Sequence, residues 1–206
     1  MLNKYSDLNE NALDALREIG NIGTGHATTA LSAMTGKDIE IDIPLIRIIS
    51  YKDAPSLLGG AEEFKVGILL RVNGLSGIFM FLLNEEFTKQ MLETLLGTKV
   101  DDVRNLDELS SSAICETGNI MCCSYINAIS KLTDTEMTVS VPSICGDMVG
   151  ALLSVPMILY GYQCDELMFI ENRFQFDQKS FVSHILFLPE LDALEHMLIK
   201  LGIPYE

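Results

Sequence analysis

Residues 14–44 read DALREIGNIGTGHATTALSAMTGKDIEIDIP, and residues 112–142 read SAICETGNIMCCSYINAISKLTDTEMTVSVP. The two stretches align without a gap at an offset of 98 residues, and in both of them 22 residues separate an Asn from a Pro. The positions that share a residue include Glu18/Glu116, Gly20/Gly118, Asn21/Asn119, Ile22/Ile120, Ala30/Ala128, Ser32/Ser130 and Pro44/Pro142. A repeat of this kind predicts two related structural units in one chain.

The segments that follow each stretch also correspond. Two apolar runs, 67–72 and 77–83, flank Asn73-Gly74, a strong signal for a β-hairpin because both turn residues tolerate positive φ. The second copy offers strands over 166–176 and 181–188 with a turn at Asp177–Ser180. An amphipathic helix closes each unit, over 84–97 and 189–202.

Each unit is therefore predicted to run as long helix, strand, short helix or turn, hairpin and closing helix. The repeats cover about 11–97 and 109–202, and the acidic, polar residues 98–110 read as the linker between them. A lone unit would leave a sheet edge and a helix face uncovered, so we expect the two to pair about a pseudo-twofold axis. The prediction is one α+β domain over residues 1–206, with a six-stranded sheet and two long helices that carry the active sites.

Composition excludes several classes of protein. The chain has 14 basic and 29 acidic side chains, a net charge of −15, which disfavours nucleic acid and anionic membranes as partners. At 48% apolar it has ample material for a core, yet no apolar run approaches the ~20 residues that span a bilayer. The N-terminus lacks the pattern of a signal peptide, and the five cysteines suit reduced thiols rather than a disulfide framework or zinc site. We expect a cytoplasmic protein.

The repeated helices carry a polar stripe. Asp14, Glu18 and Asn21 are spaced by four and three residues and so lie on one helical face; Ser112, Glu116 and Asn119 repeat this in the second copy. The opposite side carries apolar residues suited to the core, among them Tyr125 and, near the end of the second helix, Leu132. A simple explanation is that polar residues occupy the solvent side of an amphipathic helix. Duplication argues against it, since Asn is a poor helix former and a solvated face requires no particular residue.

A Glu and an Asn one turn apart suggest a limited set of reactions. A carboxamide is neither a nucleophile nor a useful acid or base, but it can hold a water through one donor and one acceptor. Positioning a water is the task of such a residue in phosphoryl hydrolysis. The Glu can pair with a basic side chain of a protein substrate. The stripe thus suggests catalysis on a phosphoryl group carried by a partner.

At these residues the sequence resembles the CheC/CheX/FliY family of chemotaxis phosphatases. The signature of that family is an acidic residue or Ser, three residues, Glu, two residues, Asn, 22 residues and Pro. It occurs twice here, as Asp14/Glu18/Asn21/Pro44 and Ser112/Glu116/Asn119/Pro142. Two complete motifs in a chain too short for an added flagellar-switch domain resemble the CheC branch most.

The resemblance implies hydrolysis of the aspartyl phosphate of the response regulator CheY. Asn21 or Asn119 would orient the attacking water, and Glu18 or Glu116 would pair with the regulator's active-site Lys. The Mg²⁺ would belong to CheY, so the chain needs no cofactor or metal of its own. The resemblance also implies that binding of CheD raises the activity, and we expect a monomer when free. The alternative is a non-catalytic adaptor that binds CheD, phosphorylated CheY or both.

Other motifs are weaker. The G-x-G of NIGTGHA lies within a helix pattern and follows no strand, so a dinucleotide loop is disfavoured. The three histidines are scattered, and Ser110–Ser112 have no companion His. Residues 144–156, ICGDMVGALLSVP, read as a buried short helix or else as an exposed docking patch, in which Asp147 and Met148 are candidates for the CheD contact.

Overall fold

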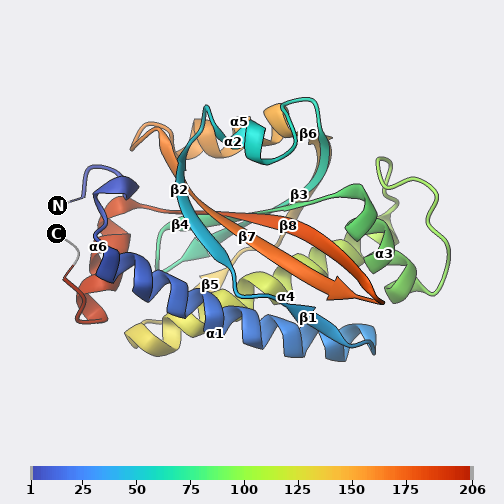
Figure 1. Cartoon of the computed structure of the whole chain (residues 1–206), viewed down its shortest axis with the longest axis horizontal. Helices are drawn as coiled ribbons and strands as arrows, with labels where there is room; N and C mark the ends of the chain where they lie inside the picture. Colours follow the sequence, from blue (N-terminus) through green and yellow to red (C-terminus); the bar gives the residue numbers. More distant parts are fainter. Residues whose placement is uncertain (1, 205–206) are drawn as a thin grey trace.

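The fold places two long helices side by side beneath one face of an antiparallel sheet (Figure 1). This computed structural model describes residues 2–204. Helix α1 spans Glu10–Thr35 and helix α4 spans Glu108–Thr133, each of 26 residues, and they run in opposite directions. Both helices occur where the repeat predicts them.

Capping residues set the ends of these helices. The side chain of Asn9 accepts a hydrogen bond from the Ala12 N–H, and that of Asp107 accepts one from the Ser110 N–H at 2.8 Å, as preferred N-cap residues do. Because Asp107 caps α4, the predicted linker ends at residue 107 instead of 110. The placement of Leu132 in the core was wrong: it lies in the exposed last turn of α4.

Residues 2–204 form a sheet of eight strands where six were predicted. In each half the expected first strand is broken in two, into β1 (Ile39–Ile41) and β2 (Leu45–Ser50), and into β5 (Thr138–Val139) and β6 (Ser143–Met148). The breaks fall at Pro44 and Pro142, which have no N–H to donate to the ladder. Both pieces of a pair lie along the same neighbouring strand, so the sheet is still six strand positions wide.

The two predicted hairpins form the middle of the sheet. Strands β3 (Phe64–Asn73) and β4 (Gly77–Leu83) make one, and β7 (Glu166–Phe176) and β8 (Lys179–Pro189) make the other. Strand β4 pairs with β8 at the centre. The edges are exchanged between halves: β1 and β2 pair with β7, whereas β5 and β6 pair with β3.

The turns of both hairpins contain residues with positive φ angles. Gly74 has φ +89°, the conformation for which a glycine is favoured. The second turn is shorter than predicted, because Lys179 and Ser180 already belong to β8 and pair with β7. Only Asp177 and Gln178 remain in the turn, with φ +48° and +63°, as in a two-residue hairpin loop.

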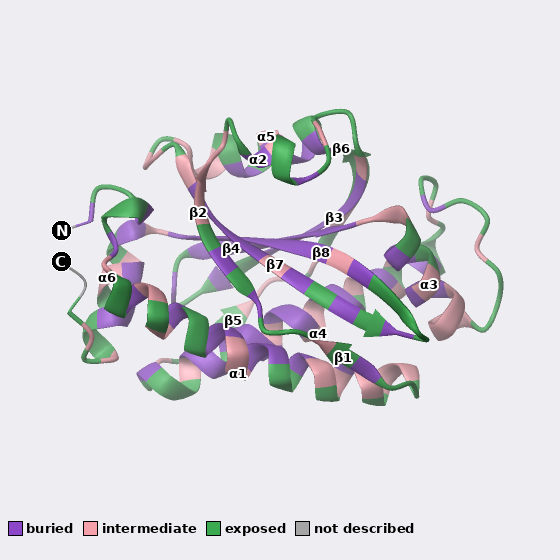
Figure 2. Cartoon of the chain, viewed as in Figure 1, coloured by how far each residue is buried: buried purple, intermediate pink, exposed green. Residues whose placement is uncertain are grey.

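Two cores hold the layers together (Figure 2). The larger lies between the sheet and α1 and α4 and includes Leu16, Phe79, Ile129 and Phe187. The smaller lies on the other face, beneath α2 (Ala54–Leu57) and α5 (Val149–Tyr160). Residues 144–148 of the predicted short helix are strand β6 instead, so α5 begins at Val149. Two further helices, α3 (Glu85–Leu96) and α6 (Leu191–Lys200), close the ends of the molecule, and a short 3₁₀ helix, Tyr5–Asp7, precedes α1.

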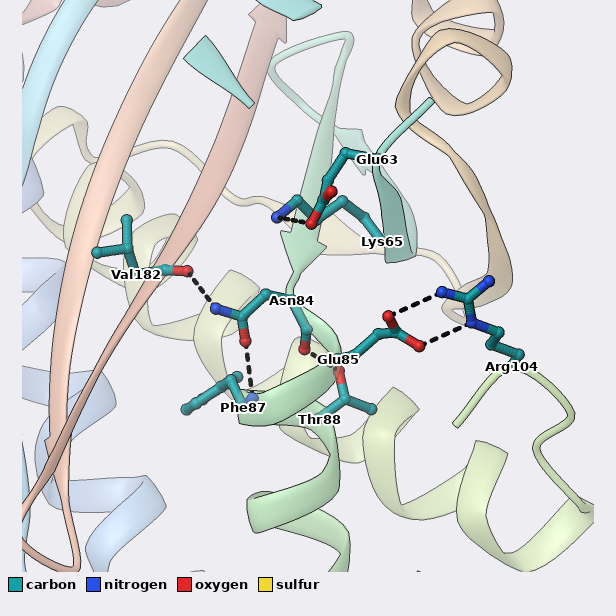
Figure 3. Close-up of polar contacts among 8 residues, drawn as sticks. All are labelled: Glu63, Lys65, Asn84, Glu85, Phe87, Thr88, Arg104 and Val182. Atoms are coloured by element: carbon teal, nitrogen blue, oxygen red, sulfur yellow. Dashed lines mark hydrogen bonds and ion pairs between the residues drawn. The ribbon is translucent and has the colours of Figure 1, made fainter. Parts of the chain in front are cut away.

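The connection between the halves is fixed near the start of α3 (Figure 3). Arg104 makes two hydrogen bonds to the carboxylate of Glu85, at 2.8 and 3.0 Å, and its guanidinium lies 4.7 Å from the centre of the Phe64 ring. A bidentate Arg–carboxylate pair with a cation–π contact is among the more specific surface interactions. Arg104 therefore holds the loop against α3 and β3.

Candidate functional site

The predicted polar stripe lies on the solvent side of both long helices. On α1, Asp14 and Glu18 are exposed and Asn21 is half-buried; on α4, Ser112 and Glu116 are exposed and Asn119 is half-buried. Asp14 forms an ion pair with Arg17, one turn further along α1. In each copy the carboxylate is exposed, and the half-buried amide lies one turn further along the same helix.

The proline of the motif connects the sheet edge to this helix. Pro44 is buried, and a Cβ atom added at Gly20 would lie 3.1 Å from its Cγ. The chain between β1 and β2 therefore rests on α1 at the residue before Asn21. In the second copy α4 likewise contacts both β5 and β6, which flank the half-buried Pro142. The contact of Pro44 with α1 gives a physical reason for the spacing between Asn21 and Pro44 in the first copy.

The two asparagines have different surroundings. The Oδ1 atom of Asn21 is buried and has no hydrogen-bond partner among residues 2–204. The Oδ1 atom of Asn119 accepts a hydrogen bond from the thiol of Cys123, one turn later, with 3.6 Å between sulfur and oxygen. Burial and the nearby charge of Glu116 raise the pKa of the Cys123 thiol, which keeps it protonated as a donor. Residue spacing of i, i+4 was the available sequence signal for this contact.

A buried polar chain links the two helices to the sheet. Gly23 lets α1 approach α4 closely, since a Cβ atom there would lie 3.0 Å from the Cα of Tyr125. The Tyr125 hydroxyl donates to Oδ1 of Asn172 at 2.9 Å and lies 3.0 Å from Oγ1 of Thr24. Burial raises the pKa of Tyr125 to about 12, so the hydroxyl remains a donor at neutral pH. Sequence reasoning placed Tyr125 in the core but missed these bonds. The available signal was that Asn172 shares the alternate, buried positions of β7 with the apolar residues Met168, Ile170 and Phe174.

The chemistry available is that of exposed carboxylates and half-buried amides. Among residues 2–204 no group of three or more His, Cys, Asp or Glu side chains could hold a metal ion. None of the helices formed by those residues is both long and apolar enough to cross a bilayer. Such groups can supply hydrogen bonds and charge to a bound partner.

A second surface lies on the opposite face of the sheet, between α5 and strands β3 and β6. It contains a groove of about 490 Å³ whose lining includes Leu69, Ile144, Cys145, Asp147, Val155 and Ile158. Asp147 is exposed, and its side chain accepts a hydrogen bond from the Met148 N–H at 2.8 Å just before α5 begins. Helix α5 buries one side, including Leu152 and Leu153, and exposes the other. The buried side of α5 therefore fits the prediction of a buried helix, and its exposed side fits the prediction of an exposed patch.

Known proteins resemble this chain in sequence and in structure. Residues 12–44 and 109–145 match the model of the CheC-like family, which covers both motifs. The CheY-P phosphatase CheC of Bacillus subtilis is 30% identical over 203 residues, covering 96% of this chain and 97% of the relative.

Solved structures share the fold. The crystal structure of Thermotoga maritima FliY has a TM-score of 0.75 at 22% identity, covering 95% of this chain and 98% of that one. The FliM middle domain from H. pylori has a TM-score of 0.68 at 11% identity, covering 94% and 99%. Identity this low shows the fold alone. The full-length similarity to CheC and the match of both motifs show that the chain belongs to the CheC-like family.

Proposed function

We propose that the chain is a phosphatase that hydrolyses the aspartyl phosphate of the response regulator CheY, with two sites, one on α1 and one on α4. The observation that carries the proposal is the duplicated pair of an exposed Glu and a half-buried Asn one turn apart. A relative of almost equal length is named for the same activity. The exchanged sheet edges support treating the two halves as pseudo-equivalent units.

In this mechanism the asparagine acts on water. The carboxamide of Asn21 or Asn119 enters the active site of the regulator and positions a water by hydrogen bonding, in line with the phosphorus–oxygen bond that breaks. Water attacks phosphorus and the regulator's aspartate leaves with the electron pair of that bond. The long, capped helix keeps the amide in place, which supplies orientation rather than acid–base chemistry.

The glutamate acts on the partner. Glu18 and Glu116 are exposed on the outer side of their helices and can form a charge-assisted hydrogen bond with a Lys of the regulator. Asp14 and Ser112 precede them by one turn and support the motif, and Pro44 and Pro142 fix the neighbouring loop. The Mg²⁺ of the reaction belongs to the regulator, so no metal is assigned to this chain.

The surface around α5 is assigned to CheD. Asp147 offers a charge and Met148, 52% exposed, an adaptable apolar side chain beside the groove. Because this surface lies on the opposite face of the sheet from α1 and α4, CheD and CheY could bind at the same time. We propose that bound CheD raises the phosphatase activity of a chain that is monomeric when free and works in the cytoplasm.

Phosphate release from phosphorylated CheY tests the proposal. The chain should accelerate release, and the double variant Asn21→Ala/Asn119→Ala should return it to the rate of spontaneous decay. No acceleration by the wild-type chain, with or without CheD but with measurable binding, would leave the alternative of a non-catalytic adaptor.

Substitution of the Asn and substitution of the Glu should affect the binding of phosphorylated CheY differently. Asn21→Ala/Asn119→Ala removes the groups that hold water and should leave binding of phosphorylated CheY nearly intact. Glu18→Lys/Glu116→Lys places a positive charge opposite the partner's Lys and should weaken binding by about ten-fold or more. Affinities measured by fluorescence or calorimetry check this, and equal losses of affinity in both variants would contradict the assignment of roles.

A further inference from the structure

The most exposed large apolar side chains of the described chain are duplicated. Val141 is 87% exposed and Ile43 is 79% exposed, the two highest values among such residues. They occupy the same place in the two repeats, immediately before Pro142 and Pro44. A single exposed aliphatic residue needs no explanation, since folded proteins carry many. Two of them at the same position of an internal repeat do need one.

Ile43 lies beside the first proposed site, and Val141 lies in the corresponding loop of the second repeat. Pro44 packs against α1 at Gly20, so Ile43 protrudes from a loop held next to Asn21. Val141 protrudes from the corresponding loop between β5 and β6, and both strands contact α4. An exposed apolar side chain therefore lies beside the Glu/Asn pair of α1, and Val141 occupies the same place in the second repeat.

The loop suits a docking role because it is stiff before binding. The residue before a proline is restricted to extended conformations, and the proline itself has a fixed φ. Ile and Val are branched at Cβ and have few rotamers. An anchor of this kind loses little conformational entropy when it is buried by a partner. The proline of the motif therefore also keeps the preceding side chain exposed to solvent.

We propose that Ile43 and Val141 are apolar anchors that insert into a hydrophobic depression on the phosphorylated regulator, beside the acidic pocket that holds its aspartyl phosphate. This inference rests on the proposed function and assigns to each site a contact that selects the partner. The Glu pairs with charge, the Asn holds water, and the aliphatic residue supplies the buried apolar contact that exposed charges lack. The anchors contribute equally to binding of the substrate and of the transition state, so they affect affinity and not the rate of the chemical step.

Steady-state phosphate release from phosphorylated CheY of Bacillus subtilis, measured in proteins with one working site, tests the inference. In an Asn119→Ala background, Ile43→Ser should raise KM about ten-fold and leave kcat unchanged, as expected for loss of uniform binding. Ile43→Val should restore the KM. Val141→Ser in an Asn21→Ala background should repeat the result, with rescue by Val141→Ile.

Ile199→Ser is the matched control. Ile199 is 59% exposed on α6, outside the two motif loops, and its replacement should leave KM unchanged. If the parent single-site proteins release phosphate and the anchor variants have the parental KM, the inference is wrong while the proposed function stands. If the wild-type chain itself fails to accelerate release, the proposed function is wrong. A rise in KM for Ile199→Ser equal to that for Ile43→Ser would also overturn the inference, since the effect would then be one of general surface polarity.

Discussion

The two proposed sites share their Glu and Asn but differ in what surrounds them. On α1 the residue one turn after the Asn is Gly25, which is exposed and has no neighbouring atom within 4 Å of a Cβ position. On α4 the same position is Cys123, half-buried and hydrogen-bonded to Asn119. The amide oxygen of Asn21 lacks a partner among residues 2–204, whereas that of Asn119 has one.

The difference shows how a duplicated motif can keep its reactive groups while its support changes. Glycine in a helix interior costs roughly 1 kcal/mol relative to alanine, so the glycines of α1 loosen the helix that carries Asn21. The second helix has larger side chains at the same positions and fixes its amide by a hydrogen bond. We therefore expect the site on α4 to be the stronger.

Removal of each asparagine gives the largest expected effect. Asn119→Ala should remove more than half of the phosphatase rate and Asn21→Ala less than half, because each site has its own Glu and Asn on its own helix. The double variant should approach the spontaneous decay of phosphorylated CheY. Steady-state phosphate release from the three proteins provides the comparison.

The expected order of the three phosphatase rates assumes that each site works without the other. Circular dichroism should show that all three variants keep the wild-type fold. Complete loss of turnover in either folded single variant would mean that one site needs the other.

The glycines of α1 offer a second comparison, of intermediate size. Gly23→Ala should lower the free energy of unfolding by about 1–2 kcal/mol, since the added Cβ would meet the backbone of Tyr125 at 3.0 Å and overpacking outweighs the gain in helix propensity. Gly25→Ala is the matched control, because it has open space and should raise the free energy of unfolding by up to about 1 kcal/mol. Urea denaturation measures both.

The same pair of variants sharpens the comparison of the sites. If a loose α1 limits the first site, Gly25→Ala in an Asn119→Ala background should also raise its kcat. A more stable protein with an unchanged rate would show that helix stiffness is not what separates the two sites.

Much of the fold follows from the sequence because its signals are local. The repeat, the Asn73-Gly74 turn and the amphipathic periods predict the long helices, both hairpins and the closing helices. The exchange of edge strands, with β2 on β7 and β6 on β3, depends on pairing between residues more than 70 apart, which no local pattern records. The breaks at Pro44 and Pro142 could have been predicted from the missing N–H groups.

For the candidate site, too, the sequence predicts the local features and not those that depend on tertiary packing. Spacing alone places Glu18, Asn21 and their repeats on the outer side of two helices. The bonds from Tyr125 to Asn172 and from Cys123 to Asn119 depend on side-chain positions and on burial, and burial is fixed only when both helices have packed on the sheet.

Cys123 gives the smallest effect and the most direct test of the difference between the sites. In an Asn21→Ala background, where only the second site works, Cys123→Ala should lower kcat about five-fold with an unchanged KM, because a hydrogen bond of about 1 kcal/mol no longer orients Asn119. Cys115→Ala is the matched control: Cys115 lies one turn before Asn119 and makes no hydrogen bond to it within residues 2–204.

The pH dependence of kcat tests the same hydrogen bond. Burial and the charge of Glu116 raise the pKa of the Cys123 thiol above its ordinary value of 9.0, so this donor should persist from about pH 7 to about 9 and disappear only at higher pH. The parent protein should therefore lose kcat above that range, and Cys123→Ala should lack this step in its pH profile. If Cys123→Ala and Cys115→Ala have the same kcat and the same profile as the parent, the thiol does not position the amide, and the two sites differ only in the stiffness of their helices.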